Sequence, residues 1–189
     1  MRLPTSSRRW RPAATWLSVV TSLLPLTAPL HPLAPAGAAV LAPTTCPAAA
    51  VTLLDGLYRW HLAHQDDRGP LVLASQRARF APALYSQLVR AAALTPADGG
   101  FLDFDVFSGT QVNTFAARVQ GCRSRGGRLE AVVAVEAGLR RRSDLTPQLL
   151  RYTLEPNGPG RWRILDITYP TEPSFSLAKH LEGLLKPGR

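Results

Sequence analysis

Two aspartates, Asp105 and Asp166, stand where a carboxylate could serve as a general base. Asp105 lies with Asp103 in an acidic and aromatic stretch, residues 102–111, that predicts a loop or a short edge strand. Shelter from water raises the pKa of a carboxyl group and lets it remove a proton from a substrate. The alternative, which we favour, is structural: the phenylalanines of the stretch fill one end of the core, and an aspartate caps backbone N–H groups.

Asp166 belongs to an apolar stretch, residues 162–169, that alternates as a β-strand does. Strict alternation places Asp166 on the face that carries Trp162 and Ile164. On a concave face Asp166 would be a buried acid in a pocket, whereas on a convex face it would be solvated or paired with an arginine. Leu165 and Ile167 make the opposite face apolar as well, so the pattern leaves both options open.

Hydrogen-bonding side chains on the first predicted helix, residues 47–64, can face the same pocket, since Tyr58, His61 and His64 follow one another at three-residue spacing. Two histidines without a third ligand, a cysteine cluster or a Glu-x-x-His pattern do not make a metal site, so we expect neither a metal nor a cofactor. The pocket candidates are Tyr58, His61, Asp103, Asp105, Gln111, Tyr152, Trp162 and Asp166.

The elements that must position these residues follow from periodicity. Helical spacing of apolar residues predicts helices over residues 47–64 and about 81–94, and a short terminal helix over 176–186. Alternation between Gly-, Pro- and Arg-rich turns predicts four antiparallel strands, over residues 113–122, 129–137, 148–155 and 162–169. We expect an α+β fold in which the N-terminal helices cover one face of a curved antiparallel sheet of about four strands.

Alternation also predicts which side of the first strand faces the core. Phe115, Ala117 and Val119 fall on one face of residues 113–122, opposite Thr114 and Arg118. The pattern therefore predicts that Phe115 points inward and Thr114 outward.

The first 38 residues have the pattern of a secretory signal peptide: four arginines, an apolar run over residues 13–26, and small residues at 36–39. An uncut membrane anchor is the alternative, although prolines interrupt the run. We expect a signal peptide over 1–38, a short segment over 39–46 and a single domain over 47–186, in a protein that is periplasmic or secreted. The protein would then contact a membrane only through its signal peptide, during export.

Cys46 and Cys122 are the two cysteines of the chain. In an exported protein such a pair usually forms a disulfide, and closing so long a loop would stabilise the fold by about 4 kcal/mol. Two buried free thiols are the alternative.

The formal charge is +9, of which the four signal arginines supply a large part. The remaining basic residues, among them Arg140–Arg142, lie at predicted strand ends and turns without interleaved aromatic residues. This arrangement favours a solvated basic rim over a nucleic-acid site, so we expect no nucleic-acid partner.

Three stretches, YRW at residues 58–60, DFDVFSGTQ at 103–111 and RWRILDI at 161–167, precede a terminal helix with Leu177 and Leu181. Together they resemble the DUF3828 family, exported bacterial domains of unknown function similar in architecture to the NTF2-like, cystatin-like superfamily. The resemblance covers residues 48–185, with Val106 standing where such proteins often have proline. It implies helices packed into the concavity of a bent sheet with a pocket between them, and it carries over no catalytic residue.

Three functions fit these expectations. The leading one is an exported, non-catalytic binding module that takes a small apolar ligand or a protein partner. The second is a small enzyme of the ketosteroid isomerase or dehydratase type, with Asp105 or Asp166 as base and Tyr58, His61 or Tyr152 as hydrogen-bond donors. The third is an immunity or inhibitor protein. The resemblance also implies that the protein could form a homodimer through the exposed face of the sheet.

Overall fold

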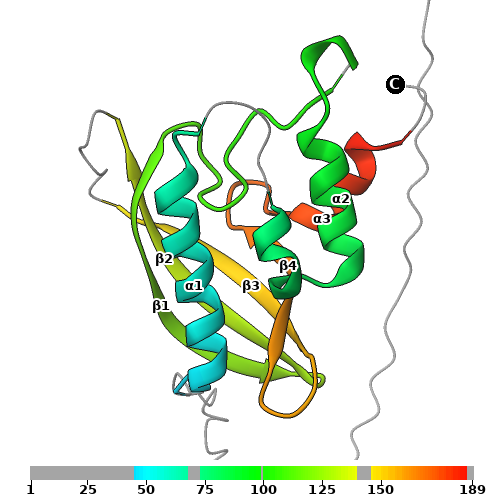
Figure 1. Ribbon diagram of the computed structural model, residues 1–189. Helices are drawn as coiled ribbons and strands as arrows, with labels where there is room; N and C mark the ends of the chain where they lie inside the picture. Colours follow the sequence, from blue (N-terminus) through cyan, green and yellow to red (C-terminus); the bar gives the residue numbers. More distant parts are fainter. Residues whose placement is uncertain (1–44, 68–72, 99, 140–145, 187–189) are drawn as a thin grey trace, which may run out of the picture. The chain divides into compact units, whose positions relative to one another are not determined.

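Helices precede and follow one antiparallel sheet in the computed structural model, which describes residues 45–67, 73–98, 100–139 and 146–186 (Figure 1). The predicted signal peptide and Arg140–Arg142 lie outside these residues. All described residues belong to one compact unit, Val40–Arg189. The elements in chain order are α1 (Ala48–His64), the 3-10 helix η1 (Ala74–Arg79), α2 (Pro82–Ala92), the 3-10 helix η2 (Pro96–Asp98), β1 (Asn113–Arg125), β2 (Arg128–Gly138), β3 (Gln148–Pro156), β4 (Trp162–Tyr169), β5 (Phe175–Ser176) and α3 (Leu177–Leu184).

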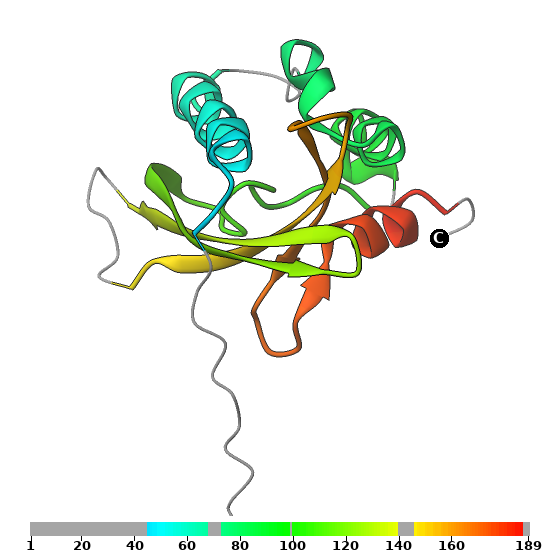
Figure 2. The same cartoon turned by 90° about the horizontal axis from the view of Figure 1, so that it is seen from below.

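The strands form a five-stranded sheet in the order β1-β2-β3-β4-β5, with every neighbouring pair antiparallel. Helices α1 and α2 lie on the same side of this sheet (Figure 2). The α+β class and the antiparallel meander are therefore confirmed. The expected strand number was one too low, because β5 has only two residues, too few for a periodic pattern to reveal.

The turn between β1 and β2 is tighter than the sequence suggested. Both strands extend to the two-residue turn Gly126–Gly127, whose φ angles are 56° and 75°. Positive φ at both central residues is the requirement of a two-residue hairpin turn, and glycine meets it without strain. The long, twisted β1–β2 ribbon follows from these two glycines.

β-Bulges interrupt the alternation at two points in β1 and at one point in β4, and two of these bulges change the predicted strand faces. In β1, Thr114 pairs with Ala137 and Ala116 pairs with Glu136, so Phe115 is the extra residue. Because of this bulge, Thr114 is buried at 1% exposure and Phe115 is only half-buried, the reverse of the prediction.

The other bulge that changes a predicted face lies in β4. Thr153 pairs with Asp166 and Leu154 with Ile164, which leaves Leu165 without a partner residue in the register. The inserted residue reverses the alternation, so Ile164 and Ile167 are both fully buried. The prediction that Asp166 shares a face with Ile164 was wrong for this reason.

One apolar core fills the space between the helices and the sheet. Fully burying a leucine or isoleucine side chain stabilises the fold by about 2 kcal/mol, so this core is the main source of stability. Trp162 is partly buried and packs against it. The largest fully buried side chains are Tyr152, Tyr169, Phe107, Leu54, Leu57, Leu73, Leu84, Leu88, Leu150, Leu154, Ile164 and Ile167.

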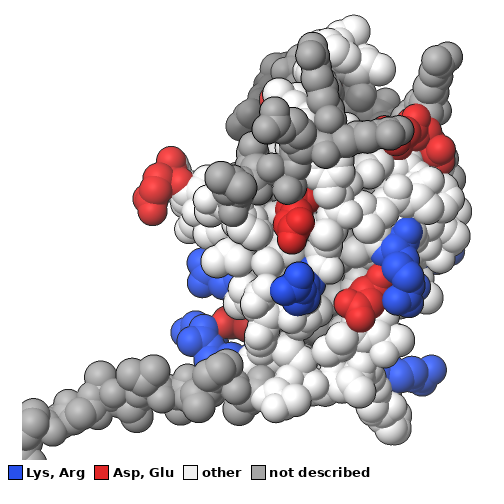
Figure 3. Space-filling model, turned by 90° about the vertical axis from the view of Figure 1, so that its left-hand side faces the viewer, with Lys and Arg blue, Asp and Glu red and all other residues white. Residues whose placement is uncertain are grey.

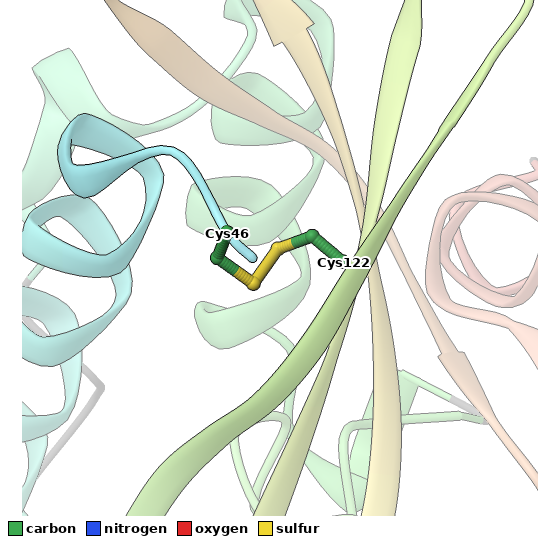
Figure 4. The surroundings of a disulfide bond; sticks show 2 residues. All are labelled: Cys46 and Cys122. Atoms are coloured by element: carbon green, nitrogen blue, oxygen red, sulfur yellow. A yellow bond between two sulfur atoms is a disulfide. The ribbon is translucent and has the colours of Figure 1, made fainter. Parts of the chain in front are cut away.

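A disulfide joins Cys46, immediately before α1, to Cys122 on β1 (Figure 4). Its two sulfur atoms are 2.11 Å apart, and the cysteines are 76 residues apart in the chain. The predicted pairing is confirmed, and such a bond is typical of a protein that folds outside the reducing cytoplasm. Within the described ranges, no helix has the length and apolar character needed to cross a membrane.

Charged side chains are interspersed on the face of the molecule that Figure 3 shows, with basic and acidic groups side by side. Two ion pairs join neighbouring strands: Arg123 of β1 with Glu130 of β2, and Arg163 of β4 with Glu155 of β3. An alternating pattern of this kind gives the face little net field.

Candidate functional site

A cleft of about 880 Å³, here called the first cleft, opens where the C-terminal ends of α1 and α2 meet the loop before β1. Helix α1 contributes Trp60, His61 and His64. The opposite wall is formed by Ala91 and Ala92 at the end of α2 and by Leu94 just after it. The loop contributes Phe101 to Val106, and the approach to β1 contributes residues 110–113. Its size is within the range of small-molecule sites.

His61 of α1 and Asp105 of the loop form a hydrogen-bonded pair in the lining of the first cleft. The Nε2–H of His61 donates to Oδ2 of Asp105 at 2.9 Å, and the two side chains are 4% and 22% exposed. The His61 ring also packs edge-on against Phe107, with the ring centroids 5.2 Å apart. Nδ1 of His61 is buried and has no hydrogen-bond partner among the described residues.

Asp105 is held in its ionised form. Burial by itself raises the pKa of Asp105, and the hydrogen bond and charge of His61 lower it. The Phe107 N–H donates to Oδ1 at 2.9 Å and the Ser108 hydroxyl adds a further hydrogen bond, so the net pKa lies below the usual range. A carboxylate with a lowered pKa is a weak base, which weighs against Asp105 as the base of an isomerase.

Three buried tyrosines support the loop, two of them by direct hydrogen bonds. The Tyr58 hydroxyl donates to the Phe107 carbonyl at 2.9 Å, and the Tyr169 hydroxyl donates to the Val106 carbonyl at 2.8 Å. Tyr152 lies 2.8 Å from the Tyr58 oxygen and donates to it, since the Tyr58 hydrogen is already used. Burial raises the pKa of all three tyrosines, so they are neutral donors at ordinary pH.

The end of α1 is fixed to the start of β1 by a paired hydrogen bond. The Gln65 side chain accepts from the Thr114 N–H at 2.8 Å and donates to the Thr114 carbonyl at 2.9 Å. This contact uses both polar atoms of the amide and sets the distance between two walls of the first cleft. The walls are therefore held by specific polar contacts as well as by packing.

The lining of the first cleft combines aromatic faces with negative charge. Trp60, Phe101 and Phe104 supply aromatic surface, and Phe101 is 39% exposed. Trp60 is stacked on His64, with ring centroids 5.3 Å apart. The acidic residues are Asp67, Asp103 and Asp105, and neither lysine nor arginine occurs among the described residues that line the cleft. In a chain of formal charge +9, this is a locally negative site.

The structure divides the predicted pocket residues into three groups. His61, Asp103, Asp105 and Gln111 line the first cleft. Tyr58 and Tyr152 lie beneath it, 4% and 0% exposed, inside the core. Trp162 and Asp166, on β4, are not part of its lining.

Asp166 organises the start of α3. It accepts hydrogen bonds from the Ser176 hydroxyl at 2.6 Å, from the Ala178 N–H at 2.9 Å and from the Ile167 N–H at 2.8 Å. Ser176 in turn is the N-cap of α3 and accepts from the Lys179 N–H. These contacts give Asp166 a capping role at a helix N-terminus, where a carboxylate is stabilising.

Sequence reasoning considered His64 next to the pocket but did not assign Trp60 or Asp67 to it. Trp60 and His64 are one helical turn apart, and Asp67 follows the helix end, so all three belong to one end of α1. The signal was present in the sequence, but only the tertiary contact with the loop shows that this end of α1 faces a cleft.

No group of three or more histidine, cysteine, aspartate or glutamate side chains in the described part of the chain is arranged to hold a metal ion. His61 uses Nε2 for Asp105, and His64 uses Nδ1 for the Trp60 carbonyl at 2.7 Å. Comparison with protein-family models, characterised proteins and solved structures finds no match to this chain.

Proposed function

We propose that this protein is an exported, non-catalytic binding module whose first cleft holds a small organic cation with an aromatic or apolar body. The observation that carries the proposal is the cleft itself: about 880 Å³, lined by three aspartates and three large aromatic side chains. The disulfide supports a location outside the cytoplasm, in the periplasm or the medium, with the N-terminal segment as signal peptide.

The ligand class follows from the chemistry of the lining. Ionised Asp105 and the exposed carboxylates of Asp67 and Asp103 attract a positive charge. Aromatic faces such as that of Trp60 bind cations by the cation–π interaction and cover apolar ligand surface. An anionic ligand would meet like charge in the same cleft.

Calorimetric titration with 2-phenylethylamine tests the proposal, with 2-phenylethanol as neutral and phenylacetate as anionic comparison. We expect the amine to bind most tightly, and the double substitution Asp67→Asn with Asp103→Asn to weaken its binding about fivefold. Neither of these two side chains makes a hydrogen bond or ion pair within the described chain, so the variant should fold normally.

The matched control is Glu136→Gln with Glu172→Gln, which removes the same charge away from the first cleft. It should bind the amine as the unmodified chain does. Equal binding of amine and alcohol, or equal loss in both double variants, would show that the cleft does not select a cation.

A further inference from the structure

A second cleft, of about 760 Å³, lies between η1, α2 and the turn that joins β3 to β4. Its apolar lining comes from Phe80, Pro82, Tyr85 and Val89, of which Val89 is 42% exposed. None of its lining residues belongs to the first cleft. It is thus a separate site on the same domain.

The charge of the second cleft is opposite to that of the first. Arg77 from η1, Arg90 from α2 and Arg163 from β4 line it, and no acidic residue is among its described lining residues. Arg77 and Arg90 are exposed and make no ion pair with any acidic residue in the described ranges. Two guanidinium groups are therefore available to a ligand.

Contacts within the protein restrict the positions of two of these guanidinium groups, those of Arg77 and Arg163. The Arg77 guanidinium carbon lies 5.7 Å from the centre of the Tyr85 ring, a cation–π contact that holds it over the cleft wall. The Arg163 Nε donates to Glu155 Oε1 at 2.6 Å, which leaves its two terminal nitrogens without a hydrogen bond in the described structure. Ordering these groups beforehand lowers the entropy that a ligand must overcome on binding.

We propose that the second cleft binds an organic anion, a carboxylate or phosphate group carried on an apolar body. Guanidinium groups bind such anions through paired, charge-assisted hydrogen bonds. Phe80, Pro82, Tyr85 and Val89 then cover the apolar part of the ligand. The anion could be a free amphiphile or the headgroup of a membrane lipid, and both present the same chemistry.

Titration of the full chain with octyl phosphate, followed by calorimetry, tests this assignment, with 1-octanol as the neutral comparison. We expect octyl phosphate to bind and octanol to bind much more weakly. Arg77→Gln with Arg90→Gln should weaken octyl phosphate binding about tenfold or more, since two charge-assisted contacts are lost. Arg163 is left in place because its removal would leave Glu155 unpaired.

The matched control is Arg118→Gln with Arg128→Gln, two exposed arginines of β1 and β2 outside the second cleft. It should retain binding within about twofold, as should the Asp67→Asn, Asp103→Asn variant of the first cleft. The aspartate variant distinguishes the two proposals, because it should weaken amine binding at the first cleft and leave octyl phosphate binding at the second cleft unchanged. Equal loss in both arginine variants, equal binding of octanol, or no binding of octyl phosphate would overturn the assignment.

Vesicles of phosphatidylcholine with and without phosphatidylglycerol distinguish the two sources of the anion. Co-sedimentation with the anionic vesicles that is lost in the Arg77→Gln, Arg90→Gln variant identifies a lipid headgroup. Binding of octyl phosphate without vesicle binding identifies a free amphiphile. Vesicle binding that the variant retains would instead show a general surface attraction and contradict the site.

Discussion

At the scale of single residues, the hydrogen bond between His61 and Asp105 sets the character of the first cleft. It joins α1 to the loop before β1 and, with the Phe107 N–H and Ser108 contacts, lowers the pKa of Asp105 against the opposite effect of burial. Asp105 was recognisable in the sequence because acidic and aromatic residues alternate around it. The structural alternative was confirmed in part, since Asp105 accepts from the Phe107 N–H and Phe107 is fully buried.

The lowered pKa of Asp105 predicts a pH dependence of stability. A carboxyl group whose folded pKa lies below its unfolded value of about 4 stabilises the fold above that value and loses this contribution as pH falls through the folded pKa. Asp105→Asn should lower the free energy of unfolding by about 1–3 kcal/mol at pH 7. The difference from the unmodified chain should shrink as pH falls below about 4.

Denaturant unfolding between neutral pH and about pH 2.5 measures this difference, with Asp103→Asn as control. The Asp103 side chain is exposed and makes no hydrogen bond in the described structure, so its loss should change the unfolding free energy by less than about 0.5 kcal/mol. A destabilisation by Asp105→Asn that stays constant across the range would contradict the account of this carboxylate.

At the scale of elements, periodicity located the two long helices and four strands, and failed at the bulges. A bulge inserts one residue and reverses the inward face, as at Phe115 in β1 and Leu165 in β4. Because of the bulge, apolar residues occur on both faces of β4 in the simple alternating pattern. This left the face of Asp166 ambiguous in the sequence. Its capping of α3 depends on the turn after β4, which alternation does not describe.

Helix α1 is fastened to β1 at both ends, by the Cys46–Cys122 disulfide before its first turn and by Gln65 with Thr114 after its last. Replacing both cysteines by serine should lower the free energy of unfolding by about 4 kcal/mol, because the unfolded chain regains the freedom of a long loop. Reduction of the unmodified chain should have the same effect, as followed by thermal unfolding.

The serine variant itself is the control for reduction, since a reductant should not change its melting temperature. Unchanged stability of the variant, or an equal effect of reductant on both proteins, would mean that the bond does not form in solution.

The pairing of Cys46 with Cys122 could be predicted without the fold. It needed only the expected export of the protein and the fact that the chain has two cysteines.

At the scale of the whole molecule, one small domain carries two clefts of opposite charge. The net charge of +9 does not reveal this separation, because it sums over the whole chain. The first cleft could be predicted only in part, since His61, Asp103, Asp105 and Gln111 were expected and Trp60 and Asp67 were not. Its walls come from segments about 40 residues apart in sequence, and their approach depends on tertiary packing.

The two tryptophans of the described residues give the most direct test of the central claim, that the first cleft binds an organic cation. Trp60 lines this cleft and Trp162 lies on β4 outside it. Their indole N–H signals can be followed by ¹H–¹⁵N NMR during titration with 2-phenylethylamine, after assignment with Trp60→Phe and Trp162→Phe. We predict that the Trp60 signal shifts in a saturable way while the Trp162 signal stays in place. A Trp60 signal that does not move, or two signals that move equally, would contradict the claim.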